Sequence, residues 1–501
     1  MNAHRLCLAA PCALTLLLPA AGSAQPVATS SPGGTGDPDL HIDIDVVSQR
    51  LDVARRQIEP SLGATRYEFD ERALEEIPQG PNADLNQVVL QSPGVWQDSF
   101  GQIHVRGEHG NVQYRIDGVQ FPQGLSFFGQ ALQSRFANTV SVLTGSLPAQ
   151  YGINTAGVID IQTKTGFTNP GLSLSMYGGS WNWLQPSFEE GGHSGPVDWF
   201  VSGDYLHNDR GIDNPAFNYA ALHDTTNQFH GFAHVSGIID ENTRLSFIGG
   251  AYGGQFQIPN SPGQTPGLGL SVNGISTFSS ALLNEQQRES ANFALLSLQK
   301  HVDTIDAQIA LFARNNYLHF TPDQLGDLIF NGISQNATRT DVASGIQGDA
   351  SWHVSDTNTI RGGFLVQGER ATFNTASAVL PVDASGAQTT DVPGIIRQSG
   401  GITGWLYSLY LQNEWRVLPA LTINYGARFD LADQLIQENQ LSPRVNAVWK
   451  ATPSTIVHIG YARYFAPPPL EGLSQTNITA FQNRVLTRKG PKHDIGFRLT
   501  S

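Results

Sequence analysis

The sequence predicts a mainly β protein, in which a small α+β domain precedes an antiparallel transmembrane β-barrel. Three observations lead to this fold class. A compact, glycine-punctuated region runs from Leu85 to Gly166, and from Gly171 onward long segments alternate between apolar and polar residues. The connections between these segments are alternately short and long. A small globular domain followed by many strands is typical of an outer-membrane barrel whose lumen is filled by a plug.

The first 24 residues have the pattern of an export signal that is cleaved on secretion. A basic start is followed by an apolar run, Leu6–Pro19, and by small residues that suit a cleavage site. A membrane anchor is disfavoured because this run is too short to span a bilayer and contains Pro11. Both cysteines of the chain, Cys7 and Cys12, lie in this segment, so we expect no disulfide and no cysteine-ligated metal in the mature protein.

Composition narrows the function classes. With 29 Lys and Arg against 43 Asp and Glu, the chain has a net charge of −14, which argues against a nucleic-acid partner. No later stretch approaches the ~18 consecutive apolar residues of a membrane helix, whereas transmembrane strands need only every second residue to be apolar. The motifs of common hydrolases, nucleotide-binding enzymes and zinc proteases are missing from the sequence. We therefore expect no enzyme activity, no cofactor and no metal site.

A flexible tether is predicted between the signal and the small domain, over residues 25–64. Its first part, Gln25–Asp39, is rich in Ser, Pro, Gly and Thr and has nothing to bury. One short β-prone segment follows, and one interpretation, which its position and composition do not favour, is a first strand of the next domain. The residues of this segment are Ile42, Asp43, Ile44, Asp45, Val46 and Val47.

The small domain is predicted over residues 65–166, with short helical turns that end at proline, followed by strands. The turns are expected at Ala73–Ile77 and Asn86–Gln91, and the strands at Ile103–Arg106, Gln113–Ile116 and Val158–Thr163. An aromatic loop contains Phe121, Phe127 and Phe128. Exposed aromatic residues on a loop often mark recognition, so these rings are candidates for ligand contact at the outward apex. They could equally pack the small core of the domain itself.

The region 167–501 is predicted to be the barrel. In Leu421–Leu431 every odd position is apolar or aromatic and the even positions are Thr, Asn, Gly, Arg and Asp, which gives one apolar and one polar face. In the neighbouring segment, the spacing of Trp405 and Trp415 corresponds to roughly 33 Å along a strand. At a tilt near 40° this projects to about 25 Å, the height of the apolar band of an outer-membrane barrel. A soluble β-sandwich would use shorter strands.

Connection lengths support the barrel independently. Tight turns alternate with long polar loops, as expected when one end of a barrel faces the periplasm and the other faces the medium. The tight turns are expected near 240–242, 303–304, 355–358, 419–420 and 452–454, and the long loops near 208–226, 255–285, 319–337, 374–400 and 467–489.

Three motifs of the small domain carry a family resemblance. VRG at Val105–Gly107, RIDGV at Arg115–Val119 and the run Val140–Gly166 resemble, in order and spacing, the plug domain of TonB-dependent receptors. The resemblance implies energy-coupled uptake of a scarce small-molecule ligand, such as a siderophore or cobalamin, and a TonB-type periplasmic partner. It also implies that the segment from Ile42 to Val47 is the TonB box, which adds as a strand to the sheet edge of that partner.

The resemblance further implies that an arginine of the plug pairs with a carboxylate of the barrel wall. Arg106 of the VRG motif and Arg115 are the plug candidates, and Glu414 and Asp430 are lumen-facing wall candidates by strand phase. The alternative is that these arginines are solvated in a polar lumen, where exposed ion pairs contribute little.

The barrel region departs from the family in strand number. About 14 strands are predicted, against about 22 in plugged transporters, and the final run, Pro491–Ser501, resembles an internal strand. We therefore expect that the C-terminal part of the barrel is missing, which would leave an unpaired sheet edge in lipid. The expected protein is a monomeric receptor of the cell outer membrane in contact with lipid. The alternatives are a passive porin and a secreted ligand-binding β protein that does not transport.

Overall fold

The computed structural model describes residues 44–58, 63–98, 102–109, 111–122, 127–153, 156–212, 222–434, 437–467 and 470, together with the backbone of 492–500. The predicted export signal, the first part of the predicted tether and two residues of the β-prone segment, Ile42 and Asp43, lie outside these residues. No helix in the described part of the chain is long and apolar enough to cross a membrane.

A helix opens the described chain, α1 (Ile44–Ile58). The sequence predicts a flexible tether with an extended segment here, and the structure corrects this. Val47, Leu51 and Ala54 recur at helical spacing, and all three are buried. Val47 and Leu51 pack against Ile238 of the large sheet described below. The apolar stripe of the helix packs on the wall, and this tertiary contact outweighs the β propensity of the local sequence.

Residues 63–166, called the plug below, form a small α+β unit. Its elements are β1 (Ala64–Asp70), α2 (Glu71–Glu76), η1 (Gly80–Asn82), α3 (Leu85–Val89), β2 (Val95–Gln97), β3 (Ile103–Val105), β4 (Glu108–His109), β5 (Val112–Ile116), β6 (Val119–Phe121), η2 (Ser134–Phe136), β7 (Ala137–Gly145) and β8 (Gly157–Thr163). Five strands form a sheet in the order β1-β7-β8-β5-β6, in which β5 and β8 are parallel, and β2, β3 and β4 form a smaller sheet. The predicted helical turns correspond to α2 and α3, and the predicted strands to β3, β5 and β8, so this part of the prediction is confirmed.

Local sequence signals explain two of these elements. The side chain of Asp70 caps α2 by accepting from the Ala73 N–H (2.9 Å). Asp117 and Gly118 join β5 to β6 with φ of 48° and 82°. Glycine adopts such angles freely and aspartate tolerates them, so the RIDGV motif makes a tight hairpin.

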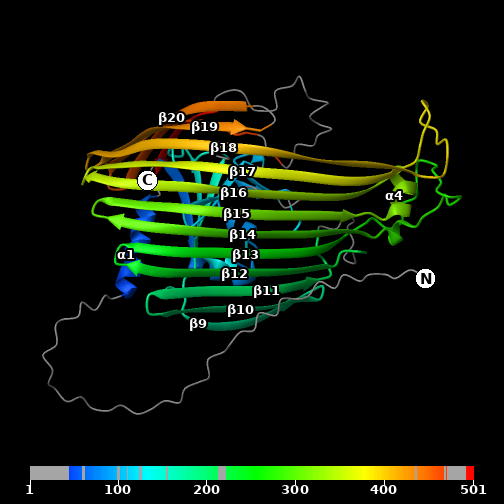
Figure 1. Cartoon of the computed structure of the whole chain (residues 1–501), viewed down its shortest axis with the longest axis horizontal. Coiled ribbons are helices and arrows are strands. Elements are labelled where there is room, and N and C mark those ends of the chain that lie inside the picture. Colours follow the sequence, from blue (N-terminus) through cyan, green and yellow to red (C-terminus); the bar gives the residue numbers. More distant parts are fainter. Residues whose placement is uncertain are drawn as a thin grey trace, which may run out of the picture. The chain divides into compact units, whose positions relative to one another are not determined.

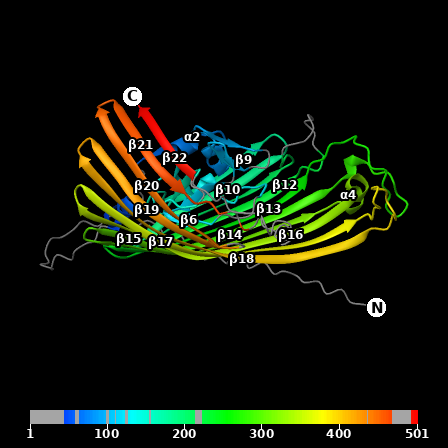
Figure 2. The ribbon, with the colours of Figure 1, turned by 90° about the horizontal axis from the view of Figure 1, so that it is seen from above.

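The rest of the described chain, called the wall, is one antiparallel sheet of 14 strands that follow sequence order. Its strands are β9 (Gly171–Gly179), β10 (Trp183–Ser194), β11 (Val197–Asn208), β12 (Thr226–Asp240), β13 (Thr243–Ile258), β14 (Glu285–Val302), β15 (Ile305–Thr321), β16 (Ile333–Ser355), β17 (Asn358–Val379), β18 (Gly394–Leu418), β19 (Leu421–Asp433), β20 (Gln437–Thr452), β21 (Thr455–Tyr464) and β22 (Lys492–Thr500), with η3 (Ser280–Leu282) and α4 (Gln324–Asn331) in its loops. Figure 1 shows most of these strands side by side, and Figure 2 shows that the sheet is curved. Within the described residues, the edge strands β9 and β22 each pair on one side only, so the sheet is open.

Tight turns join the strands at one end of the wall, as predicted, and most of the connections at the other end are long, although those between β9 and β10 and between β19 and β20 are short. β12 ends at Asp240 and β13 begins at Thr243, whereas β13 ends at Ile258 and β14 begins only at Glu285. We call the two ends of the wall the turn end and the loop end. Helix α4 lies beyond the loop end (Figure 1).

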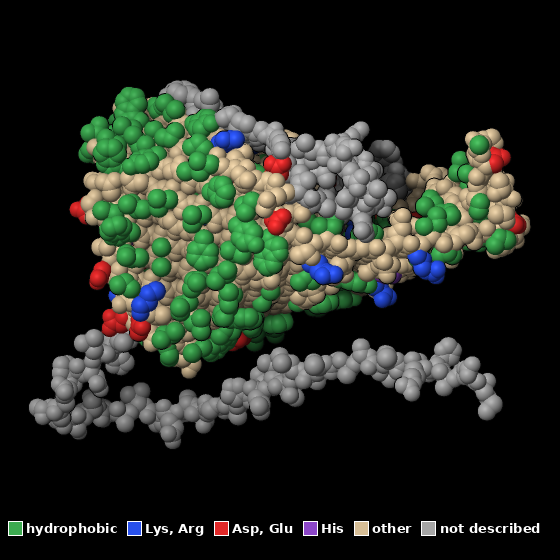
Figure 3. Space-filling view, turned by 45° about the horizontal axis from the view of Figure 1, so that its top comes forward, with side chains coloured by type: hydrophobic (Ala, Val, Ile, Leu, Met, Phe, Trp, Pro, Cys, Tyr) green, Lys and Arg blue, Asp and Glu red, His purple; other side chains and the backbone are tan. Residues whose placement is uncertain are grey.

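The two faces of the wall have the opposite polarity to the faces of a soluble protein. Leu409 of β18 is 62% exposed, whereas Asp430 of the neighbouring β19 is on the other face and only 1% exposed. Hydrophobic side chains lie on the outer surface of the sheet (Figure 3). The predicted alternation is confirmed, with its apolar face outward as lipid contact requires. A soluble β-sandwich buries that face instead.

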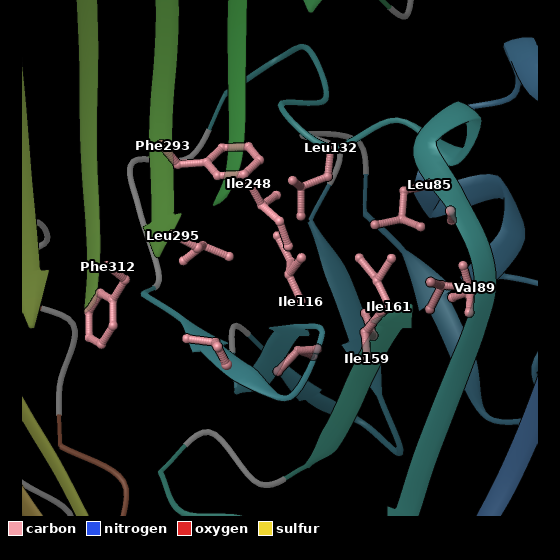
Figure 4. Close-up of a cluster of buried hydrophobic side chains, with 14 of the residues drawn as sticks. Leu85, Val89, Ile116, Leu132, Ile159, Ile161, Ile248, Phe293, Leu295 and Phe312 are labelled. Atoms are coloured by element: carbon pink, nitrogen blue, oxygen red, sulfur yellow. The ribbon is translucent and has the colours of Figure 1, made fainter. Parts of the chain in front are cut away.

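A hydrophobic core joins the plug to the inner face of the wall. Ile116, Ile159 and Ile161 of the plug sheet are fully buried. They belong to one cluster with wall side chains that include Phe293 and Phe312 (Figure 4). Burial of a side chain of this size contributes roughly 1.5–3 kcal/mol, so apolar contact stabilises the docked plug.

Candidate functional site

Two buried wall arginines hold one plug turn through its carbonyl oxygens. Arg444 of β20 donates to the carbonyls of Pro148 (2.5 Å) and Tyr151. Arg428 of β19 donates to the carbonyl of Gln150 (3.1 Å). Bonds from a charged donor are stronger than neutral ones. This segment of the predicted plug signature is therefore a docking turn.

Gly152 of the same signature lies against one of these arginines. A Cβ atom at this position would come within 2.1 Å of the Arg428 guanidinium. Asp430 accepts from Arg428 Nε (2.7 Å) and orients that guanidinium. The glycine is therefore needed for the close approach of plug backbone and wall side chain.

One wall carboxylate pairs with two plug cations. Glu189 of β10 places its Oε1 2.8 Å from Arg135 Nη1 and its Oε2 2.9 Å from Lys164 Nζ. The Glu189 side chain is 15% exposed, and those of Arg135 and Lys164 are buried still more deeply. The contact is of the kind that the family resemblance implies, but other residues make it.

The plug arginines predicted for this contact lie elsewhere. Arg106 is exposed in the turn between β3 and β4, at φ 53°. Arg115 is buried, donates to the carbonyl of Gly118 and lies over the Tyr151 ring at 5.4 Å. The VRG and RIDGV arginines thus act within or beside plug turns in this structure.

The two predicted wall carboxylates are paired within the wall itself. Glu414 lies 2.8 Å from Arg361, and Asp430 pairs with Arg428 as described above. Arg361 Nε in turn donates to the carbonyl of Gln57 in α1 (3.0 Å). Strand phase correctly predicts that these side chains face inward, but it carries no information on the group opposite each of them.

The RIDGV hairpin connects the N-terminal helix, the plug and the wall. Gln308 and Gln347 donate to the carbonyls of Asp117 (3.1 Å) and Gly118 (3.0 Å). The Asp117 carboxylate lies 3.4 Å from the guanidinium of Arg55 in α1. Helix α1 is therefore linked to this hairpin by a buried ion pair.

Helix α1 is fixed to the inner face of the wall. Arg244 of β13 places Nη1 2.5 Å from Asp52 Oδ1 and donates from Nη2 to the carbonyl of Ser48 (2.7 Å). Burial opposes ionisation of Asp52, but the charges of Arg55 and Arg244 outweigh it and lower the pKa of this carboxyl. The helix is thus held by a charged contact near the turn end.

The aromatic loop of the plug packs on the wall toward the loop end. The ring pairs, with their centroid distances, are Phe121–Phe293 (5.1 Å), Phe127–Tyr252 (5.9 Å) and Phe128–Phe256 (5.7 Å). The Glu289 carboxylate of β14 accepts from the backbone N–H groups of Phe128 (2.7 Å) and Gly129 (3.2 Å). The three rings are half-buried; all three pack against rings of the wall, and Phe121 also packs against the cluster that contains the plug core. Their contact with a ligand stays a prediction.

The polar part of the plug–wall interface consists of hydrogen bonds and ion pairs. Among the described residues, no group of three or more His, Cys, Asp or Glu could hold a metal ion. His301 and His353 both contact Asp306 (2.6 and 3.2 Å), but they do so as hydrogen-bond partners of its two oxygens. These contacts, with the apolar cluster, hold the plug on the inner face of the wall.

The docking residues Arg244, Arg444 and Glu189 are missed by the sequence analysis. A signal for them exists, because a charged residue in a membrane strand is tolerated only where it faces the lumen or another polar surface. The same rule applies to many lumen-facing residues. It does not distinguish the residues that contact the plug from those that pair with each other on the wall.

A plug docked on the polar face of a wall whose other face is apolar defines the class of plugged outer-membrane receptors. The family model described as TonB dependent receptor-like, beta-barrel, matches residues 236–498, slightly more than half of the chain. The chain therefore belongs to the TonB-dependent receptor family. Among curated proteins, none matches it.

Solved structures share this fold at low sequence identity. The ferripyoverdine receptor of the outer membrane of Pseudomonas aeruginosa aligns with a TM-score of 0.59 and 14% identity over 81% of this chain and 57% of its own. The siderophore receptor PiuA from Acinetobacter baumannii gives 0.61 and 13% over 88% and 70%. The ferric citrate transporter FecA gives 0.62 and 14% over 87% and 67%. The chain thus spans little more than half the length of the ferripyoverdine receptor.

Proposed function

We propose that the protein is an outer-membrane receptor that takes up a scarce ligand when a TonB-type periplasmic protein pulls on its N-terminal segment. The docked plug carries this proposal, because it is held on the wall by contacts that a pull on α1 can reach. The first turn of α1 contains four residues of the predicted TonB box, Ile44, Asp45, Val46 and Val47.

The contacts of α1 suggest the order of events. To add as a strand to a partner's sheet, the first turn of α1 must unwind, which withdraws Val47 from its buried site. Further unwinding separates Asp52 from Arg244 and then Arg55 from Asp117. The RIDGV hairpin loses a counter-ion at that point, so the plug is loosened where it meets the wall.

The ligand class that we propose is an iron chelate, bound at the loop end of the plug. Two structural neighbours are named for such ligands, ferripyoverdine and ferric citrate, which favours this class over cobalamin. The aromatic loop with Phe127 and Phe128 lies at this end of the plug and offers apolar contact surface.

The two alternative functions fit the geometry less well. A passive porin needs an open lumen, whereas the plug core here packs directly against the inner face of the wall. A secreted binding protein needs a polar outer surface, whereas the outer face of the wall exposes side chains such as Leu409 and Leu411.

Val46→Pro tests the coupling step. Val46 is the third residue of α1 and is 59% exposed. Proline is tolerated in the first turn of a helix, but it cannot donate to a strand ladder. We expect the full chain with Val46→Pro to bind the C-terminal domain of a TonB protein at least about tenfold more weakly than the wild type, a loss of about 1.4 kcal/mol. Val46→Ala is the matched control and should bind as the wild type does.

If Val46→Pro and Val46→Ala bind the TonB domain with the same affinity as the wild type, this segment is not the TonB box. Circular dichroism and amide exchange of α1 then show whether the helix is intact in both variants.

A further inference from the structure

An open pocket at the loop end of the wall has the features of a second binding site. It lies among the outer ends of β9, β10 and β11 and has a volume of about 340 Å³. Small-molecule sites begin at about this size. The residues that matter in its lining are Tyr177, Trp181, Trp183, Asn208 and Arg210. None of them takes part in the plug contacts described above.

Three aromatic rings form the apolar part of this pocket. Tyr177 and Trp183 meet edge to face, with centroids 6.0 Å apart. Trp183 Nε1 donates to Gln185 Oε1 (3.2 Å), which helps to fix the orientation of its ring. Trp181 is 40% exposed, and its ring faces the Arg210 guanidinium at 5.9 Å. The rings therefore present partly open, oriented faces.

Trp181 is held in a strained backbone conformation. Trp181 and Asn182 are the central residues of the turn between β9 and β10, with φ of 62° and 55°, and the Trp183 N–H donates to the Ser180 carbonyl (3.3 Å). Positive φ at both positions defines a type I′ turn, for which Asn-Gly is the favoured pair. A bulky residue there costs on the order of 1–3 kcal/mol. Such strain is expected where the side chain has a function.

The polar rim of the pocket offers hydrogen-bonding groups and one charged side chain, that of Arg210. Within the part of the chain that the structure describes, the Tyr177 hydroxyl, the Asn208 Nδ2 group and the Arg210 guanidinium have no hydrogen-bond or ion-pair partner. Asp209, the neighbour of Arg210 in the sequence, accepts from Asn182 Nδ2 (2.5 Å). A ligand with hydroxyl groups and no charge fits such a rim.

We propose that this pocket binds one pyranose ring of a neutral saccharide. A pyranose has apolar C–H faces that pack on aromatic rings and a rim of hydroxyls that donate and accept hydrogen bonds. An anionic chelate would require several cations, and Arg210 is the single charged side chain among the described lining residues. The saccharide is either free or carried by a glycolipid, since both sources present the same ring. The site does not depend on energy-coupled uptake, because its residues lie on the wall and not on the plug.

Trp181→Asn separates binding from folding. Asparagine tolerates positive φ, so this variant relaxes the turn and should be at least as stable to heat as the wild type. It removes one stacking face, and a loss of about 1.4 kcal/mol weakens binding about tenfold. Trp449→Phe, at an exposed position near the turn end of β20, is the control and should bind as the wild type does.

The assay uses the detergent-solubilised full chain and named probes. Maltotriose, cellobiose, lactose and chitobiose are titrated by calorimetry, and vesicles with and without lipopolysaccharide are tested by co-flotation. Saturable binding that Trp181→Asn weakens about tenfold supports the proposal. Binding of at least one sugar identifies a free saccharide as the source, and binding of lipopolysaccharide vesicles only identifies a lipid-borne one. Failure of every probe to bind, equal binding by Trp181→Asn and wild type, or preference for a ferric catecholate overturns the proposal. Failure of the TonB-binding test leaves this site unaffected.

Discussion

Replacing Glu189 by glutamine is expected to loosen the plug from the wall. Glu189 is the shared counter-ion of Arg135 (2.8 Å) and Lys164 (2.9 Å), and both cations are almost fully buried. The neutral amide keeps the shape of the side chain but removes its charge. Two buried cations are then left without their main partner.

The structure sets the size of the effect. Removing one partner of a buried ion pair costs about 3–5 kcal/mol. Lys164 retains a more distant carboxylate, Glu71 at 3.8 Å, and Arg135 retains its hydrogen bond to Asn82. We therefore expect the lower end of the range, about 3 kcal/mol, which corresponds to a roughly 150-fold larger opening equilibrium for this edge of the plug.

Hydrogen exchange of the plug measures this opening directly. The peptide that contains η2 and β7, Ser134–Gly145, should exchange much faster in Glu189→Gln than in the wild type. Glu190→Gln is the matched control, because Glu190 is the next residue in the same strand and bonds to Trp199 of the wall (2.8 Å). An equal increase in both variants, or an increase of less than about threefold in Glu189→Gln, would refute the assignment of Glu189 as a plug anchor.

Three further substitutions test other parts of the structure. Burial raises the pKa of Asp327 in α4 to about 8. The stabilisation that the protonated side chain gives to the loop end is therefore complete below about pH 4 and is lost as the pH rises through the folded-state pKa. Asp327→Asn should slow proteolysis of this loop at pH 9 but not at pH 5, and equal rates of the variant and the wild type at pH 9 would contradict this. Arg244→Met removes the counter-ion of Asp52 and should speed amide exchange in α1 at least about tenfold at pH 7. Because the pKa of Asp52 is lowered, the wild type loses this contact only as the pH falls through the lowered pKa. A difference in exchange rate between Arg244→Met and the wild type that stays constant down to acid pH would count against the ion pair. Gly152→Ala should lower the thermal midpoint, since its Cβ would meet the Arg428 guanidinium, and an unchanged midpoint would show that the plug turn is not docked this way.

The wall is the part of the fold that the sequence predicts well, because transmembrane strands follow a local rule. The alternation in Leu421–Leu431 depends only on which face of a strand meets lipid, and the tight turn after Asp240 depends only on its own residues. Helix α1 is different. The segment is stable as a helix because its apolar stripe packs against Ile238, which is distant in the sequence. The local sequence carries no information about this contact.

The docking contacts are partly predictable for the same reason. A plug cation that meets a wall carboxylate was expected, and Arg135, Lys164 and Glu189 form such a contact. The particular residues depend on which strand lies beside which plug turn. Glu414 and Asp430 face inward as expected, yet each has an arginine on its own sheet as partner.

The central claim is that a pull on the N-terminal helix releases the plug while the wall stays intact. Force spectroscopy of the full chain in a lipid bilayer, pulled from its N-terminus, tests this most directly. The account predicts a first extension of about 30 Å as the 15 residues of α1 unwind, because a helix about 22 Å long becomes a strand about 50 Å long, then release of the plug, with the wall strands still paired. Unravelling of wall strands before or together with the plug would contradict it.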